Sequence, residues 1–271
     1  MSVKRRRSAE KWILDRSTLR RVRDRTGKSH VAHYKLSQRY AENISSPLEH
    51  FHAHRKEATG ILLLDGKWVR IRGESFCIHI AYDAGIGVVD YWIDCTENKQ
   101  AYGYILRRLK DAGYDLRVAV SDGHSSLISL FEEEKIIHQR CLFHLLQDIQ
   151  EMLKIRGELF GGNHILYSRL KYILKSKTIE IFVERLRIFR EKSLPLFTSP
   201  MQRYAIKWFW FILHDATVHL SFKAGEVPRT SNLLENINGQ IEARLKTFRG
   251  IKSEKSLHNL LKILFRFRNY K

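Results

Sequence analysis

Residues 58–95 carry short apolar runs of a kind that is typical of β-strands. Three runs, rich in β-branched and aromatic residues and broken by Gly and Asp, read GILLLDGKWVRI, SFCIHIAYDA and VVDYWIDC. They predict three consecutive strands, which we expect to pair as an antiparallel meander. The apolar run Leu116–Val120 predicts a fourth strand, and KIIHQRC around 135–141 predicts a short fifth one.

Helical patterns separate these strands. NKQAYGYILRRLKDAG predicts a helix that Gly113 ends, and residues 125–134 and LFHLLQDIQEML predict two more. The apolar face of the first helix would consist of Tyr102, Ile105, Leu106 and Leu109. The resulting order, βββ-α-β-α-β-α, predicts an α/β fold with a mixed five-stranded sheet, and it is the element order of a ribonuclease-H-like core.

The rest of the chain is expected to be helical. Residues 156–228 contain the patterns IEIFVERLRIF and SPMQRYAIKWFWFILHDA, the second with Ser199 as its N-cap, and a closing helix is predicted from about 232 to 248. We therefore expect residues 58–155 to form the first part of the core, 156–228 an all-helical insertion, and 229–271 the closing helix with a basic tail.

The first 57 residues predict a pair of helices and a connector. STLRRVRDRTG has Ser17 as N-cap and Gly27 as a stop, and SHVAHYKLSQRYAEN begins again at Ser29. Two short helices joined by a tight turn match a helix-turn-helix, whose second helix would contact DNA. An ordinary basic helical hairpin is the alternative interpretation of the same pattern.

The charge of the chain favours the DNA-binding interpretation. The formal net charge of +19 and the pI of about 9.9 indicate a polyanionic partner, nucleic acid before an anionic membrane. Residues 1–30 hold eleven Lys and Arg against three acids, and residues 240–271 hold nine against two. The candidate contacts to double-stranded DNA are Arg20, Arg21, Arg25, Lys28, His33, Tyr34, Lys35, Arg39, Arg244, Lys246 and Arg249.

Cysteine usage and hydropathy predict a cytoplasmic protein. The three cysteines, Cys77, Cys95 and Cys141, are too few and too scattered for a disulfide framework, which favours a reducing compartment. No stretch approaches the 18 apolar residues of a membrane span. The opening MSVKRRRSAEKW is charged but no apolar run follows it, so we expect no signal peptide.

Three carboxylates stand out by their places in the predicted elements. Asp65 ends the apolar run of the first strand, Asp122 lies at the tip of the fourth, and Glu235 lies in the first turn of the closing helix. Each also has a structural interpretation, because Asp-Gly pairs favour turns and Asn232 with Glu235 fits a capping box. Their joint placement favours chemistry: two Mg²⁺ ions roughly 4 Å apart can be held by carboxylates and can stabilise both reacting oxygens of a phosphodiester.

Cys141 and His144 form a second candidate group. Their spacing puts both on one face of a first helical turn. They could be part of a zinc site, a core cysteine with an unrelated histidine, or a local structural pair beside the acids.

Four ordered motifs that span residues 61–250 together resemble the bacterial DDE transposases of insertion sequences, on the mutator-type branch: LLLDGKWV, AVSDGHSSL, HQRCLFHLLQDI and TSNLLENINGQIEARLKTFRG. The resemblance implies a ribonuclease-H-like core interrupted by a helical insertion. It also implies that Asp65, Asp122 and Glu235 form a DDE triad that binds two Mg²⁺ ions, for which Mn²⁺ can substitute. Cys141 and His144 correspond to the family's Cys-x-x-His signature.

The expected activity is therefore DNA transposition. A protein of this kind hydrolyses DNA at the ends of its element and joins the freed 3′-OH to target DNA. The expected partners are terminal inverted repeats, target DNA and further copies of the chain, as a homodimer or higher oligomer, at the nucleoid of a bacterial or archaeal cell. Two other functions fit the same sequence: a catalytically retired, transposase-derived sequence-specific DNA-binding protein, and a structure-selective ribonuclease-H-like nuclease.

Overall fold

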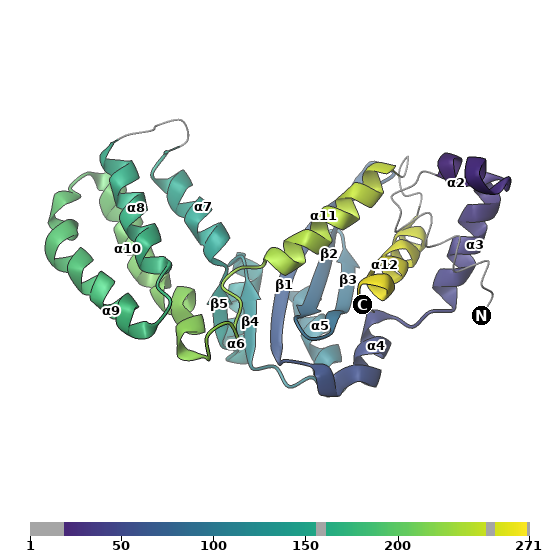
Figure 1. Cartoon of the computed structure of the whole chain (residues 1–271), viewed down its shortest axis with the longest axis horizontal. Coiled ribbons are helices and arrows are strands. Elements are labelled where there is room, and N and C mark those ends of the chain that lie inside the picture. The colour runs from purple at the N-terminus through teal and green to yellow at the C-terminus, as the bar shows by residue number, and fades with distance from the viewer. Residues whose placement is uncertain (1–18, 156–160, 248–252, 270–271) are drawn as a thin grey trace. The chain divides into compact units, whose positions relative to one another are not determined.

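A computed structural model describes the backbone of residues 19–155, 161–247 and 253–269. Its five strands are β1 (Ile61–Ile71), β2 (Glu74–Asp83), β3 (Gly87–Asp94), β4 (Val118–Ser121) and β5 (His138–Arg140) (Figure 1). They form one sheet in the order β3-β2-β1-β4-β5, with β1, β2 and β3 antiparallel and β4 parallel to β5. The predicted meander and the mixed five-stranded sheet are both confirmed.

The first hairpin turn lies farther along the chain than an Asp-Gly turn would put it. β1 continues through Asp65 and Gly66, and Asp65 lies opposite Ile80 of β2. The chain turns at Arg72 and Gly73, whose φ angles of 53° and 94° are both in the left-handed region. Asp65 therefore lies within a paired strand, which excludes the turn interpretation of this residue.

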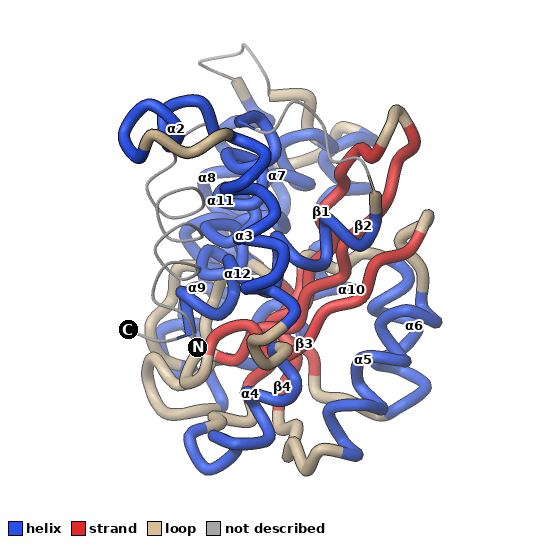
Figure 2. Tube along the Cα trace, turned by 90° about the vertical axis from the view of Figure 1, so that its right-hand side faces the viewer, coloured by secondary structure: helices blue, strands red, loops and turns tan. Residues whose placement is uncertain are grey.

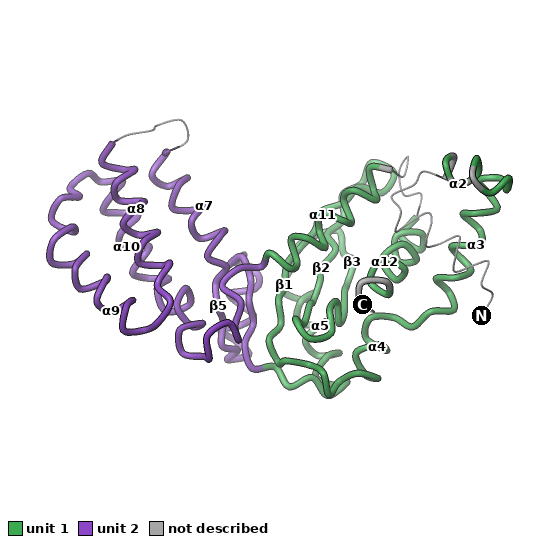
Figure 3. The backbone as a smooth tube through the Cα atoms, in the orientation of Figure 1, with its two compact units in different colours: residues 1–116, 232–271 green, residues 117–231 purple. Residues whose placement is uncertain are grey.

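The chain divides into two compact units (Figure 3). The first combines residues 1–116 with residues 232–271, and the second consists of residues 117–231. The predicted boundaries at 155 and 228 stay predictions, but α7 (Leu142–Met152) packs its apolar face into the helical core of the second unit.

In the described part of the first unit, six helices accompany β1, β2 and β3, which run side by side in Figure 2. β3 contacts α4, α5 and α12, and α11 lies on β1. A 3₁₀ turn, Arg55–Glu57, follows α4. The helices are α2 (Leu19–Thr26), α3 (His30–Glu42), α4 (Pro47–His54), α5 (Lys99–Asp111), α11 (Asn232–Thr247) and α12 (Glu254–Asn269).

The predicted basic tail is in fact the helix α12. It buries Leu257, Leu261 and Phe265 in the first unit, so its apolar positions outweigh the charge that marked it as a tail. α12 packs against α3. The connector predicted before β1 likewise contains a helix, α4, which begins with a capping box formed by Ser46 and Glu49.

The second unit, as far as its residues are described, contains β4, β5 and five helices, as well as the single-turn segments Phe189–Ser193, Leu194–Leu196 and Val218–Ser221. Its helices are α6 (Ser125–Glu134), α7 (Leu142–Met152), α8 (Gly162–Leu174), α9 (Ile179–Ile188) and α10 (Pro200–Thr217). The predicted N-cap of α10 is confirmed, because Ser199 and Gln202 form a capping box. Among the described residues of both units, no helix is long and apolar enough to cross a lipid bilayer.

Candidate functional site

Asp65 is held by two hydrogen bonds inside the first unit. The backbone N–H of Gly66 donates to Oδ1 at 2.9 Å, and Nδ2 of Asn238 donates to Oδ2 at 2.6 Å. Hydrogen bonds of this kind favour the ionised carboxylate and fix its orientation. The side chain of Asp65 is half-buried, so part of it remains accessible to solvent.

The helix α11 lies along β1 in matching register. Asn238 bonds Asp65, and Glu242, one turn later, accepts from Nζ of Lys67 at 3.0 Å. The two contacts match because the two-residue step from Asp65 to Lys67 advances about 6.6 Å along the strand. The four-residue step from Asn238 to Glu242 advances about 6 Å along the helix axis, which is nearly the same distance. Glu235 lies three residues before Asn238 and thus on the same side of the helix. The first unit therefore supplies two of the three predicted acids from packed elements.

A further carboxylate, Glu97, lies beside Gly66. A Cβ built on Gly66 would come within 2.6 Å of the carboxyl carbon of Glu97, so a larger residue here would displace that side chain. The hydroxyl of Tyr102 donates to Oε1 of Glu97 at 2.9 Å and holds it there. Burial, and then the charges of Glu97 and Asp65, raise the pKa of the Cys77 thiol. Sequence reasoning missed Glu97; its position just before the Asn98 cap of α5 was the available signal.

Asp122 follows the last residue of β4 in the second unit. Its Oδ1 accepts the backbone N–H of His124 at 2.9 Å, and Gly123 has a φ of 87°. Among the described residues, no hydrogen-bond donor reaches its Oδ2. Asp122 can therefore stabilise the turn through Oδ1 and still offer Oδ2 to a ligand.

The side chain of Arg140 packs against the turn that Asp122 begins. A Cβ on Gly123 would lie 2.6 Å from the guanidinium carbon, which also lies 5.2 Å from the ring centroid of Trp208. Nη2 of Arg140 donates to Asp148 of α7 at 3.0 Å. Burial raises the pKa of Asp148 even though Arg140 opposes the shift, so this acid is already engaged in a structural pair.

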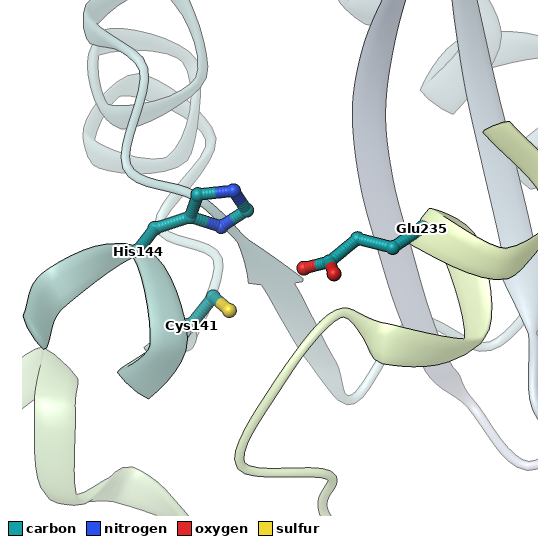
Figure 4. Close-up of side chains that lie close together, drawn as sticks. All are labelled: Cys141, His144 and Glu235. Atoms are coloured by element: carbon teal, nitrogen blue, oxygen red, sulfur yellow. The ribbon is translucent and has the colours of Figure 1, made fainter. Parts of the chain in front are cut away.

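Cys141 and His144 form a pair at the start of α7 (Figure 4). Cys141 is fully buried, and its Sγ accepts hydrogen bonds from N–H and Oγ of Ser231, both at 3.3 Å. Burial raises the pKa of the thiol, but hydrogen bonds with His144 and Ser231 outweigh it, so the pKa is lowered overall. These contacts favour a local structural pair over an isolated core cysteine. Figure 4 also draws Glu235, which belongs to the first unit.

Four of the candidate DNA contacts near the N-terminus are exposed. They are Arg21 on α2, Lys28 in the turn, and Lys35 and Arg39 on α3. Lys35 and Arg39 are four residues apart and so share one face of their helix. The expected pair of helices is present, and its exposed face is basic.

Other candidate DNA contacts are engaged within the first unit. His33 is buried and its ring bonds Thr26, and the hydroxyl of Tyr34 bonds Ser256 of α12. Arg244 is buried on α11, in contrast to the expected DNA contact, because it faces the packed side of that helix. Lys246 is exposed and pairs with Glu242 at 2.8 Å. The side chains of Arg20 and Arg25, and all of Arg249, lie outside the described residues.

Comparison with known proteins covers nearly the whole chain. The sequence profile of a family described as "Transposase, Mutator family" matches residues 18–271. The transposase for insertion sequence element IS905 from Lactococcus lactis subsp. lactis (strain IL1403) is 23% identical over 276 residues. That alignment covers 94% of this chain, but the chain spans only 66% of the length of this relative.

Proposed function

Because the chain belongs to the Mutator family of transposases, we propose that it catalyses DNA transposition with Asp65, Asp122 and Glu235 as its metal-binding triad. The observation that carries the proposal is the register between α11 and β1, which holds Asp65 and aligns the turn that contains Glu235 with it. These two acids are 170 residues apart in sequence, so packing alone brings their elements together.

The donor chemistry of the triad fits a hard divalent cation. All three side chains offer carboxylate oxygens, the ligands that Mg²⁺ and Mn²⁺ prefer. Asp65 accepts hydrogen bonds from two N–H donors, and Oδ2 of Asp122 accepts no hydrogen bond from the described residues. When bound, two such cations supply Lewis-acid stabilisation of the attacking and leaving oxygens of a phosphodiester.

The residues of the chain have separate tasks in this proposal. β1 and β4 present Asp65 and Asp122 from rigid strands, and α11 presents Glu235. The exposed Lys35 and Arg39 bind DNA phosphates at the element ends. Cys141 and His144 stabilise the start of α7 after β5. The proposed substrates are terminal inverted repeats and target DNA, bound by a homodimer or higher oligomer.

The test is the Asp122→Asn variant in a cleavage assay on DNA that carries the element end, with Mg²⁺. We expect cleavage to fall by more than about 100-fold, because even partners outside a metal's ligand shell cost 10–100-fold. The matched control is Asp115→Asn, an exposed aspartate, which should cleave as the wild type does. Cleavage by Asp122→Asn at the wild-type rate would contradict the triad. Sequence-specific binding without cleavage by the wild type would instead support the retired DNA-binding protein.

A further inference from the structure

Asn238 connects the closing helix to the first candidate acid. Its Nδ2 donates to Oδ2 of Asp65 at 2.6 Å, across 173 residues of sequence. The orientation of the amide follows from chemistry, because the reverse orientation would set the Oδ1 acceptor against a carboxylate oxygen. Asn238 is thus a neutral donor to an acid that we assign to the metal site.

We propose that Asn238 is a positioning residue of the metal site, which orients Asp65 and fixes its distance to Glu235. The inference rests on the proposed function, because that assignment makes both acids cation ligands. Glu235 lies one turn before Asn238 on the same helix. A hydrogen bond from Asn238 to Asp65 therefore sets the position of the helix that carries the second acid.

The second contact between α11 and β1, the ion pair of Lys67 with Glu242, is too weak to fix the position of α11 by itself. Lys67 and Glu242 pair at 3.0 Å, but their side chains are 23% and 46% exposed. Exposed ion pairs of this kind contribute little to stability, because water screens the two charges. The contact of Asn238 is half-buried and charge-assisted, and hydrogen bonds to an ionised group are roughly twice as strong as neutral ones.

The chemistry of an asparagine suits this task. A lysine or arginine would add a positive charge that competes with a cation for Asp65, whereas an amide donates without cancelling the charge of the carboxylate. Oδ1 of Asn238 is buried and accepts no hydrogen bond from the described residues. The contact with Asp65 is therefore the side-chain hydrogen bond that accounts for an asparagine here.

The experiment measures Mn²⁺ binding to the purified full chain without DNA, by electron paramagnetic resonance. We expect Asn238→Ala to bind Mn²⁺ about 10–100-fold more weakly than the wild type, the usual effect of losing a residue that orients a ligand. The matched control is Asn236→Ala. Asn236 is exposed on the same helix, and its Oδ1 accepts from Gln240 at 2.7 Å, so Mn²⁺ affinity should be unchanged.

Asn238→Asp keeps the shape of the side chain and replaces the donor with a second carboxylate facing Asp65. Without metal, we expect its melting temperature to be lower than that of the wild type, and Mn²⁺ to raise it by a larger amount. If both Asn238 variants bind Mn²⁺ with wild-type affinity, with or without a lower melting temperature, the positioning role is wrong.

The same measurements separate this inference from the proposed function. If the wild type binds Mn²⁺ and Asn238→Ala binds it more weakly, but the wild type never cuts DNA, transposition is wrong and the positioning role stands. If it cuts DNA and Asn238→Ala binds Mn²⁺ normally, the positioning role alone is wrong. If the wild type does not bind Mn²⁺, both proposals are wrong.

Discussion

Asp65 and Asp122 are each followed by a glycine, and the two glycines are needed for different reasons. Gly66 leaves space for the carboxylate of Glu97, whereas Gly123 adopts a φ of 87° that directs the chain away from Asp122. The same Asp-Gly motif therefore has two causes: at Gly66 the absence of a side chain leaves space for Glu97, and at Gly123 glycine permits a positive φ.

Replacing Gly123 with alanine should destabilise the protein by about 1–2 kcal/mol through left-handed backbone strain. It should cost more than Gly225→Ala, because the guanidinium of Arg140 would also have to move. Gly225 is a matched control in the same unit, with a φ of 83° and nothing within 4 Å of its missing Cβ. Urea denaturation measures both; equal losses would contradict a role for the Arg140 contact.

At the scale of elements, α3 uses one face to pack against α12 and leaves another face exposed for the predicted contact with DNA. Tyr34 and Gln38 bond Ser256 and Asn259 of α12 at 2.8 and 2.6 Å, so one face of α3 is occupied by packing. Lys35 and Arg39 remain exposed. The basic face of α3 is therefore narrower than the sequence pattern indicates.

Lys35→Ala and Arg39→Ala should each weaken DNA binding and lower the slope of log K against log salt by about 1, the effect of losing one phosphate contact. Tyr34→Phe should leave this slope unchanged and cost about 1 kcal/mol of stability, because it removes the hydrogen bond to Ser256. Fluorescence anisotropy at several salt concentrations measures the slopes. If the salt slope changed in Tyr34→Phe but not in Lys35→Ala, the face of α3 that contains Tyr34, and not the one that contains Lys35, would be the face that contacts DNA.

At the scale of the whole molecule, the chain builds two compact units that each bury their own apolar residues. The helical core of the second unit comes from α7, α8, α9 and α10 and the segments between α9 and α10, with Phe209 fully buried in it. The first unit is discontinuous in sequence, because residues 232–271 belong to the same unit as β1, β2 and β3. Units with separate cores can lose structure separately.

Phe209→Ala should cost about 3–5 kcal/mol in the second unit, the usual loss for a buried aromatic residue. Hydrogen exchange should then speed up in α8 and α10, while the amides of β1 and β2 keep their protection. Phe211→Ala is the control, because Phe211 is 85% exposed on the same helix. Equal loss of protection in both units would show that they unfold together.

The sequence by itself determined the element order and the candidate acids. The apolar runs of β1, β2 and β3, the Ser199 cap of α10 and the closing helix α11 follow from local patterns, and each is present in the structure. Local patterns suffice where the hydrophobic period and the capping side chain are encoded within a few residues.

Only the tertiary structure decided which polar groups meet. The bond from Asn238 to Asp65, the place of Glu97 over Gly66, and the burial of His33 and Arg244 depend on contacts between distant segments. The same is true of α12, whose basic residues suggested a tail until its apolar face was seen to pack against α3 and β3. A single sequence gives the period of each element, but the partner that covers each face is determined by packing.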